Sequence, residues 1–122
     1  MTYRRFLVLT ALALVTLLSA YAADPTGKWA AEFDTAIGVQ KYTYDLKADD
    51  AKLTGTATNQ SGATQIQEGK VNGDEITFVE MLKFEGQDIR IEYTGKVSGD
   101  EIKFVRKVGD FATEEFVAKR LK

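Results

Sequence analysis

Two oppositely charged residues occupy equivalent positions of an internal repeat, and they are the first candidates for a functional site. Segment 69–79 returns as segment 95–105 with only two substitutions. Glu80 directly follows the first copy, and Arg106 directly follows the second. A carboxylate and a guanidinium placed in this way could form a buried ion pair, or could orient the polar end of a ligand.

Both residues lie in segments where apolar and polar side chains alternate, which is typical of strands with one buried face. Glu80 shares the face of Phe78, and Arg106 shares the face of Phe104. We therefore expect both charged side chains to point into the core, on strands that are separated by one other strand.

Counting from the short loops places Ile91 or Tyr93 between Glu80 and Arg106. One interpretation is a structural ion pair whose hydrogen bonds are completed by Tyr93. The other is a polar end to an otherwise apolar cavity, which would hold a ligand. Inward-facing tyrosines of the second strand would line the same interior. The candidate ligand-binding residues are Tyr42, Tyr44, Glu80, Tyr93 and Arg106.

The elements that must position these side chains are short strands. Turn residues recur about every 10 to 14 positions, and this spacing is typical of an all-β barrel or sandwich. Asn72-Gly73 is a strong hairpin signal, because a type I′ turn needs positive φ at both central residues. The repeat of hairpins favours an eight-stranded antiparallel up-and-down barrel, with an open sandwich as the alternative. The expected strands are Gly27–Thr35, Val39–Lys47, Lys52–Ala57, Thr64–Val71, Glu75–Phe84, Asp88–Val97, Glu101–Val108 and Thr113–Leu121.

The first twenty-two of the 122 residues have the pattern of a secretory signal peptide. Arg4 and Arg5 precede the apolar run 6–18, and 20–22 is a small-x-small cleavage pattern. We expect cleavage before Ala23, a single domain over 23–122, no membrane span after cleavage, and a secreted or periplasmic location. No cysteine is present to carry a lipid anchor.

Composition excludes several classes of function. The chain has no Cys and no His, so thiol chemistry, disulfides, the Ser-His-Asp triad and the usual zinc or haem sites are absent. Without Arg4 and Arg5, 14 basic residues stand against 18 acidic ones. An acidic surface without a basic block argues against nucleic acid as a partner. No motif places a nucleophile beside a base, so we expect no enzyme, no cofactor and no metal.

Two classes of function stay open from the residues. The first is a binding protein that holds a small apolar or amphipathic molecule inside the barrel. The second is a non-catalytic interaction or accessory module with a filled core, because eight short strands can be filled by side chains alone. Val79, Met81 and Val105 fall on the outward face, where they could form a surface for a protein partner or for self-association.

Gly27-Lys28-Trp29 opens the first strand, and Phe116-Val117-Ala118-Lys119-Arg120 closes the last. This pair of motifs resembles the calycin superfamily of lipocalins, fatty-acid-binding proteins and avidins. The resemblance implies that Trp29 seals one end of the barrel and that Arg120 packs over its indole. Leu53-Thr54-Gly55-Thr56 is similar to a third-strand motif of avidins. The chain also resembles small exported bacterial proteins with the pattern G-x-W … G-x-V-x-G-D-x-I-x-F.

The departures from these families limit what the resemblance implies. Avidins bind biotin with several tryptophans, whereas Trp29 is the only one here, so biotin binding is not implied. Lipocalins are usually longer and have a C-terminal helix and disulfides. The resemblance therefore implies an architecture and leaves the ligand open.

Overall fold

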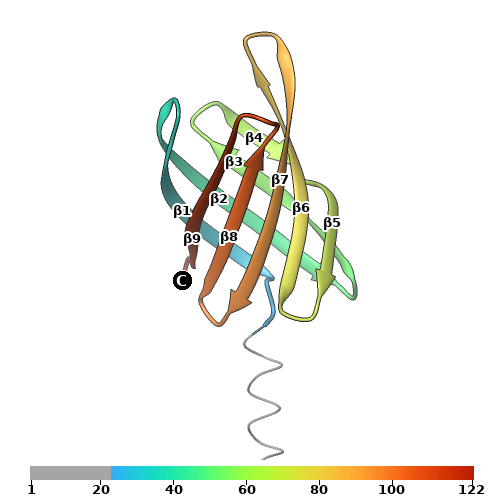
Figure 1. The fold of residues 1–122 in the computed structure, drawn as a ribbon. Coiled ribbons are helices and arrows are strands. Elements are labelled where there is room, and N and C mark those ends of the chain that lie inside the picture. The colour runs from blue at the N-terminus through green and yellow to red at the C-terminus, as the bar shows by residue number, and fades with distance from the viewer. Residues whose placement is uncertain (1–22) are drawn as a thin grey trace, which may run out of the picture.

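The computed structural model describes residues 23–122, which form one closed antiparallel β-barrel (Figure 1). The expected signal peptide, residues 1–22, lies outside the described residues. The strands are β1 (Gly27–Thr35), β2 (Gly38–Asp49), β3 (Lys52–Asn59), β4 (Gly62–Gln65), β5 (Gln67–Asn72), β6 (Glu75–Phe84), β7 (Gln87–Ser98), β8 (Glu101–Val108) and β9 (Ala112–Arg120).

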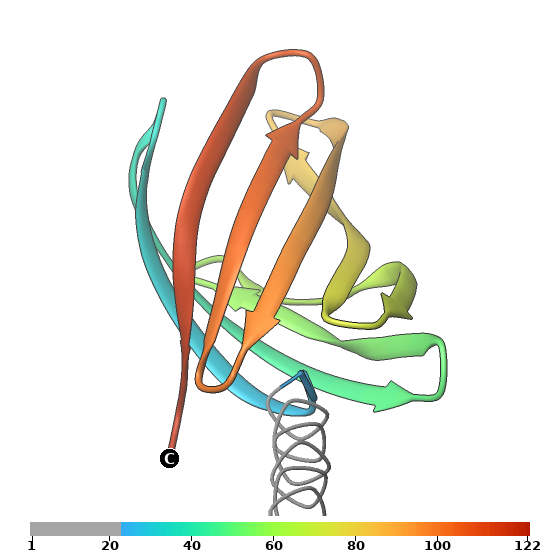
Figure 2. The same ribbon diagram turned by 60° about the horizontal axis from the view of Figure 1, so that its bottom comes forward.

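Most strands pair with their neighbours in sequence, and two pairings join strands that are not neighbours. β1 pairs with β9, and β3 pairs with β5, so the sheet returns on itself. β4 and β5 lie one after the other along β3, so together they count as one strand of the barrel. The nine strands therefore make an eight-stranded barrel. In Figures 1 and 2 the strands β7 and β8 cross β2 and β3 at a steep angle. The prediction of an eight-stranded antiparallel barrel is confirmed.

The structure differs from the prediction at the fourth strand. The segment Thr64–Val71 is divided at Ile66 into β4 and β5, and the register of β5 on β6 shifts between Gln67 and Lys70. Glu68 has a φ of 53° within this shift. β4 pairs only with β3, whereas β5 pairs mainly with β6. A β-bulge of this kind bends a strand sharply and lets a small barrel turn a corner.

Gly55 in β3 occupies a second corner of the barrel. Its φ is 151°, and a Cβ at this position would lie 1.9 Å from the backbone oxygen of Asp45 on β2. Only glycine permits such a close approach of two strand backbones.

The barrel core is built mainly from large aromatic side chains. The rings of Phe78 and Tyr93 are stacked with centroids 4.4 Å apart, and Phe104 meets both rings edge-on. Tyr44 and Trp29 have no exposed surface. These side chains fill the barrel from one end to its middle, so little free space is left there.

The apolar residues at outward positions differ in exposure, although strand alternation predicts that all of them face solvent. Val79 lies at an outward position, yet only 4% of it is exposed, and it is not available as a surface. Its pairing partners are Gln67 on β5 and Glu92 on β7, next to the bulge. Met81 is half-buried, whereas Val105 is 40% exposed. A partner surface that includes Met81 and Val105 stays a prediction.

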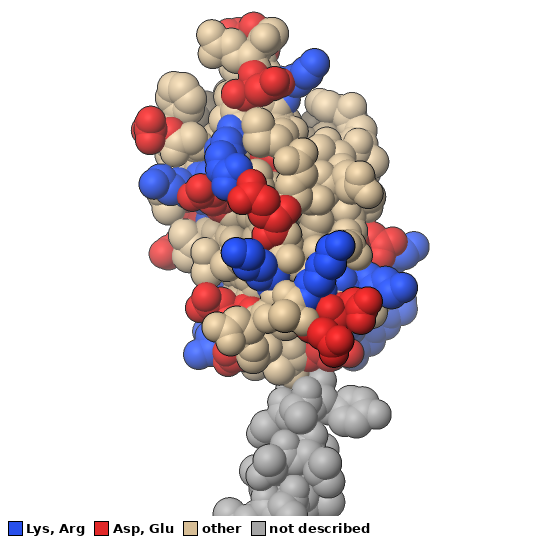
Figure 3. Space-filling model, turned by 90° about the vertical axis from the view of Figure 1, so that its right-hand side faces the viewer, with Lys and Arg blue, Asp and Glu red and all other residues tan. Residues whose placement is uncertain are grey.

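Charged side chains are mixed over the outer surface. On the face shown in Figure 3, lysine and arginine side chains lie among aspartate and glutamate side chains, without a large area of one sign. Arg90 is an example of such mixing on the surface, because its exposed side chain bonds Glu68 at 2.7 Å and Glu92 at 3.3 Å. Exposed pairs of this kind add little stability. The described residues contain no helix long and apolar enough to cross a membrane.

Candidate functional site

The two ends of the barrel differ, and the first is sealed around Trp29. The indole Nε1 donates a hydrogen bond to the backbone oxygen of Pro25 at 2.8 Å. The Arg120 guanidinium lies over the indole, 4.2 Å from its centre. Arg120 also donates to the backbone oxygens of Thr26 at 2.7 Å and Asp24 at 2.9 Å. The segment before β1 is thereby held across this closed end, and Trp29 and Arg120 lie where the calycin resemblance places them.

Glu80 and Arg106 both lie inside the barrel, with 1% and 4% of their surfaces exposed. Their nearest charged atoms, Glu80 Oε1 and Arg106 Nη2, are 3.8 Å apart. Two tyrosine hydroxyls join them more closely. Tyr93 donates to Glu80 Oε1 at 2.7 Å and accepts from Arg106 Nε at 2.9 Å. Tyr42 donates to Glu80 Oε2 at 2.9 Å and accepts from Arg106 Nη2 at 3.1 Å.

The remaining hydrogen bonds of this network follow from proton counting. A tyrosine hydroxyl has one proton to donate and two lone pairs. Tyr93 gives its proton to Glu80, so the 3.0 Å bond between the hydroxyls of Tyr44 and Tyr93 must be donated by Tyr44. Asn59 Nδ2 donates to the second lone pair of the Tyr42 hydroxyl at 3.1 Å. No buried side-chain polar atom among residues 23–122 is left without a partner.

A second carboxylate completes the surroundings of Arg106. Glu114 on β9 accepts a hydrogen bond from Arg106 Nη1 at 2.6 Å. The guanidinium also lies over three aromatic rings, with its carbon 5.2 Å from the centre of Tyr42, 5.3 Å from Phe33 and 5.7 Å from Tyr93. These contacts hold the guanidinium plane in one orientation.

The network keeps fixed protonation states around neutral pH. Burial, with the nearby Glu80 carboxylate, raises the pKa of Tyr42 to about 12. Burial also raises the pKa values of Tyr44 and Tyr93 well above the ordinary value for tyrosine. Burial alone would lower the pKa of Arg106, but Tyr93, Tyr42 and Glu114 outweigh it and raise that pKa. The three tyrosines therefore act as neutral donors, and Arg106 stays charged.

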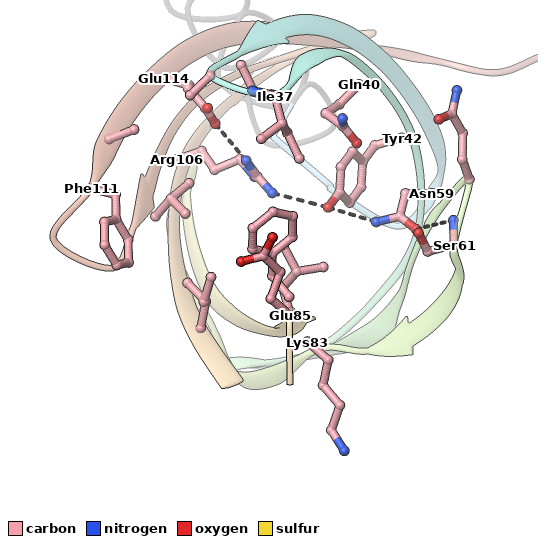
Figure 4. Close-up of a pocket in the computed structure, with 18 of the residues that line it drawn as sticks. Ile37, Gln40, Tyr42, Asn59, Ser61, Lys83, Glu85, Arg106, Phe111 and Glu114 are labelled. Atoms are coloured by element: carbon pink, nitrogen blue, oxygen red, sulfur yellow. Dashed lines mark hydrogen bonds and ion pairs between the residues drawn. The ribbon is translucent and has the colours of Figure 1, made fainter. Parts of the chain in front are cut away.

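Above this network the barrel opens into a cavity of about 560 Å³ at the mouth, the end opposite Trp29 (Figure 4). The cavity is bounded by the turns β1–β2, β3–β4, β6–β7 and β8–β9. Its apolar side chains include Ile37, Leu82, Phe84, Ile89, Val108 and Phe111. Ile37 is 63% exposed and Phe111 is 78% exposed, so the rim presents apolar surface to water. The barrel is thus filled in its closed half and hollow at its mouth.

The candidate residues divide between the cavity and the layer beneath it. Tyr42 and Arg106 line the cavity and form part of its polar floor. Glu80, Tyr44 and Tyr93 lie below them and reach the cavity only through the network.

Sequence reasoning missed two polar residues of the site, Asn59 and Glu114. Both line the cavity, and both bond to the residues of its floor. Their positions could have been found by alternation along the strands, because Asn59 shares the parity of Ala57 and Glu114 that of Ala118, and both alanines are buried. The rim residues Ile37 and Phe111 lie in turns, where alternation gives no signal.

Within residues 23–122 no three acidic side chains are grouped so that they could hold a metal ion. Comparisons of the chain with family models, with curated proteins and with solved structures find no match. The closed barrel is compatible with a calycin-like fold. The chemistry of the mouth is therefore the basis for assigning a function.

Proposed function

We propose that the protein is a small extracytoplasmic binding protein that holds an amphipathic molecule in the mouth of its barrel. The observation that carries this proposal is a cavity of about 560 Å³ with apolar walls and a buried, charged floor. Small-molecule sites in proteins typically have volumes of roughly 300 to 1,000 Å³, with mostly apolar walls and a few polar groups that fix orientation.

The polar floor has hydrogen-bonding capacity left for a ligand. A guanidinium carries five N–H donors, and Arg106 uses one each on Tyr93, Glu114 and Tyr42. Glu114, which also lines the cavity, accepts from Arg106 through one oxygen, and its other oxygen has no hydrogen bond within residues 23–122. The floor could therefore bond a ligand group that accepts, donates or does both.

The apolar rim supports the same proposal. Exposed aromatic and aliphatic side chains at a cavity entrance lose unfavourable contact with water when an apolar molecule covers them. Ile37 and Phe111 come from turns on different parts of the rim (Figure 4). An apolar tail that lies between them would leave its polar head near Tyr42 and Arg106.

Decan-1-ol is a suitable first probe, because it combines one hydroxyl with a flexible apolar chain. Titration calorimetry should give one site per molecule. Replacing Ile37 and Phe111 together with Gln should weaken binding at least fivefold, since each side chain contributes part of the roughly 1.5–3 kcal/mol of a fully buried large apolar residue. Leu121→Gln is the control, because Leu121 is 51% exposed and lies outside the cavity. Absence of any binding would favour the interaction module instead.

The extracytoplasmic part of the proposal has its own test. Mass spectrometry of the protein recovered outside the cytoplasm should give a mature chain that begins at Ala23. A full-length species retained in the membrane would contradict it.

A further inference from the structure

The charges around the mouth are not balanced, and this imbalance bears on the kind of ligand that the proposed site selects. Arg106 is the buried cation of the floor, and it faces Glu80 and Glu114. Glu85 and Lys83 also line the cavity, and Figure 4 shows the side chain of Glu85 over the mouth, whereas that of Lys83 points away from it. Two carboxylates therefore face the guanidinium of the floor, and a third lies at the rim.

Arg106 is already paired and has little attraction left for an anion. Glu114 Oε1 is 2.6 Å from Nη1, and Glu80 is bound through both tyrosine hydroxyls as well as by its 3.8 Å ion pair. A ligand carboxylate would have to displace Glu114 or enter beside it. Either change places carboxylates close together in a partly buried site, which is unfavourable.

The acceptor atoms that face the cavity are better matched to a donor. Glu114 is buried except for 11% of its side chain, and the structure gives its Oε2 no hydrogen bond within residues 23–122. Glu85 is exposed at the rim, where it adds negative potential at the entrance. A protonated amine has three donors and a positive charge, so it fits both groups.

We propose, on the basis of the binding function above, that the mouth selects amphiphiles with a cationic amine head over those with a carboxylate head. The ammonium binds Glu114 at the floor, and the apolar chain passes between the rim side chains Ile37 and Phe111. The network of Glu80, Tyr42 and Arg106 holds Glu114 in place rather than binding an anion itself.

The test compares decylamine, decan-1-ol and decanoate by titration calorimetry at neutral pH, each below its micelle concentration. Decylamine should bind at least tenfold more tightly than decanoate, with the alcohol between them. The difference should shrink as salt is raised, because the potential at the rim is screened. Decanoate binding as tightly as decylamine would overturn this inference while leaving the binding function intact. If none of the three binds, both proposals fail.

Two variants test which carboxylates cause the preference for the amine over the acid. Glu114→Gln keeps the acceptor for Arg106 but removes the charge, so the ratio of amine to acid affinity should fall at least fivefold. Glu85→Gln should lower that ratio by a smaller factor, and because Glu85 is exposed the variant does not depend on core packing. The matched control is Glu115→Gln, which removes the same charge from the outer face of β9. An equal effect of Glu115→Gln and Glu114→Gln would overturn the proposed role of Glu114.

Discussion

Glu80 and Arg106 are joined through two tyrosine hydroxyls rather than by a direct hydrogen bond. Each hydroxyl, that of Tyr42 and that of Tyr93, donates to the carboxylate and accepts from the guanidinium. The pair lies two strands apart, on β6 and β8, and β7 supplies Tyr93 between them. The two buried charged groups do not reach each other with a direct hydrogen bond, and the tyrosine hydroxyls make the hydrogen bonds that connect them.

Removing one charge of this pair should destabilise the protein more than removing both. Arg106→Met leaves the Glu80 carboxylate buried without its cation, which typically costs about 3–5 kcal/mol. The double variant Glu80→Gln with Arg106→Met should recover much of that loss. Urea denaturation of the parent, both single variants and the double variant gives the coupling free energy. Strictly additive losses would show that the two side chains do not stabilise each other.

Trp29→Ala should lower the free energy of unfolding by roughly 3–5 kcal/mol, because it removes a large side chain with no exposed surface. It also removes the ring beneath Arg120, a contact of about 0.5–2 kcal/mol. Thermal and urea denaturation check this value. Phe111→Ala is the control, since Phe111 is 78% exposed and should change stability little. A Trp29→Ala variant as stable as the Phe111→Ala variant would contradict the sealing role of the indole.

The buried tyrosines should make the protein less stable at high pH. The pKa of Tyr42 is raised to about 12 in the folded protein, whereas an unfolded tyrosine ionises near pH 10. The unfolded state therefore releases its proton first, and the stability contribution is full below about pH 10 and is lost as pH rises toward 12.

Unfolding in urea at pH 8, 10 and 11 should show this fall in the free energy of unfolding. NMR of tyrosine labelled at Cζ should meanwhile show Tyr42, Tyr44 and Tyr93 still protonated in the folded protein at pH 10.5. Ionisation of Tyr42 near pH 10 without unfolding would be inconsistent with its buried hydrogen bonds to Glu80 and Arg106.

Gly55→Ala should destabilise the barrel by more than about 1 kcal/mol, because the new Cβ meets a backbone oxygen and the φ of 151° is strained for alanine. Gly38→Ala is a matched control. Gly38 also has a positive φ, of 108°, but nothing lies within 4 Å of its Cβ position. Urea denaturation should give a clearly larger loss for Gly55→Ala, and equal losses would remove the steric argument for this corner.

Alternation along the strands predicted much of the fold and the centre of the network. It placed Glu80 and Arg106 inside and Tyr93 between them, because a period of two fixes which face each side chain takes. It could not predict the division at Ile66. That bulge arises from how the strand meets both β3 and β6, and such tertiary pairing has no local sequence period.

Alternation along the strands could not predict the cavity. Phe84, at an inward position of β6, is 40% exposed because the strand rises past the core into the rim. Ile37 and Phe111 belong to turns, so their meeting around one opening depends on the closure of the barrel. Asn59 and Glu114 could have been included by parity, but only the structure shows that their ends of β3 and β9 meet at the mouth.

The central claim, that the mouth of the barrel is a ligand site, is tested most directly by mapping where a probe binds. Backbone amide NMR spectra recorded during titration with decylamine should change at the cavity turns, with Ile37, Ser61, Glu85 and Phe111 among the most affected residues. Signals of Trp29 and its neighbours at the closed end should stay unchanged. Shifts confined to the outer face around Val105 and Val117, or no saturable shifts at all, would contradict the claim.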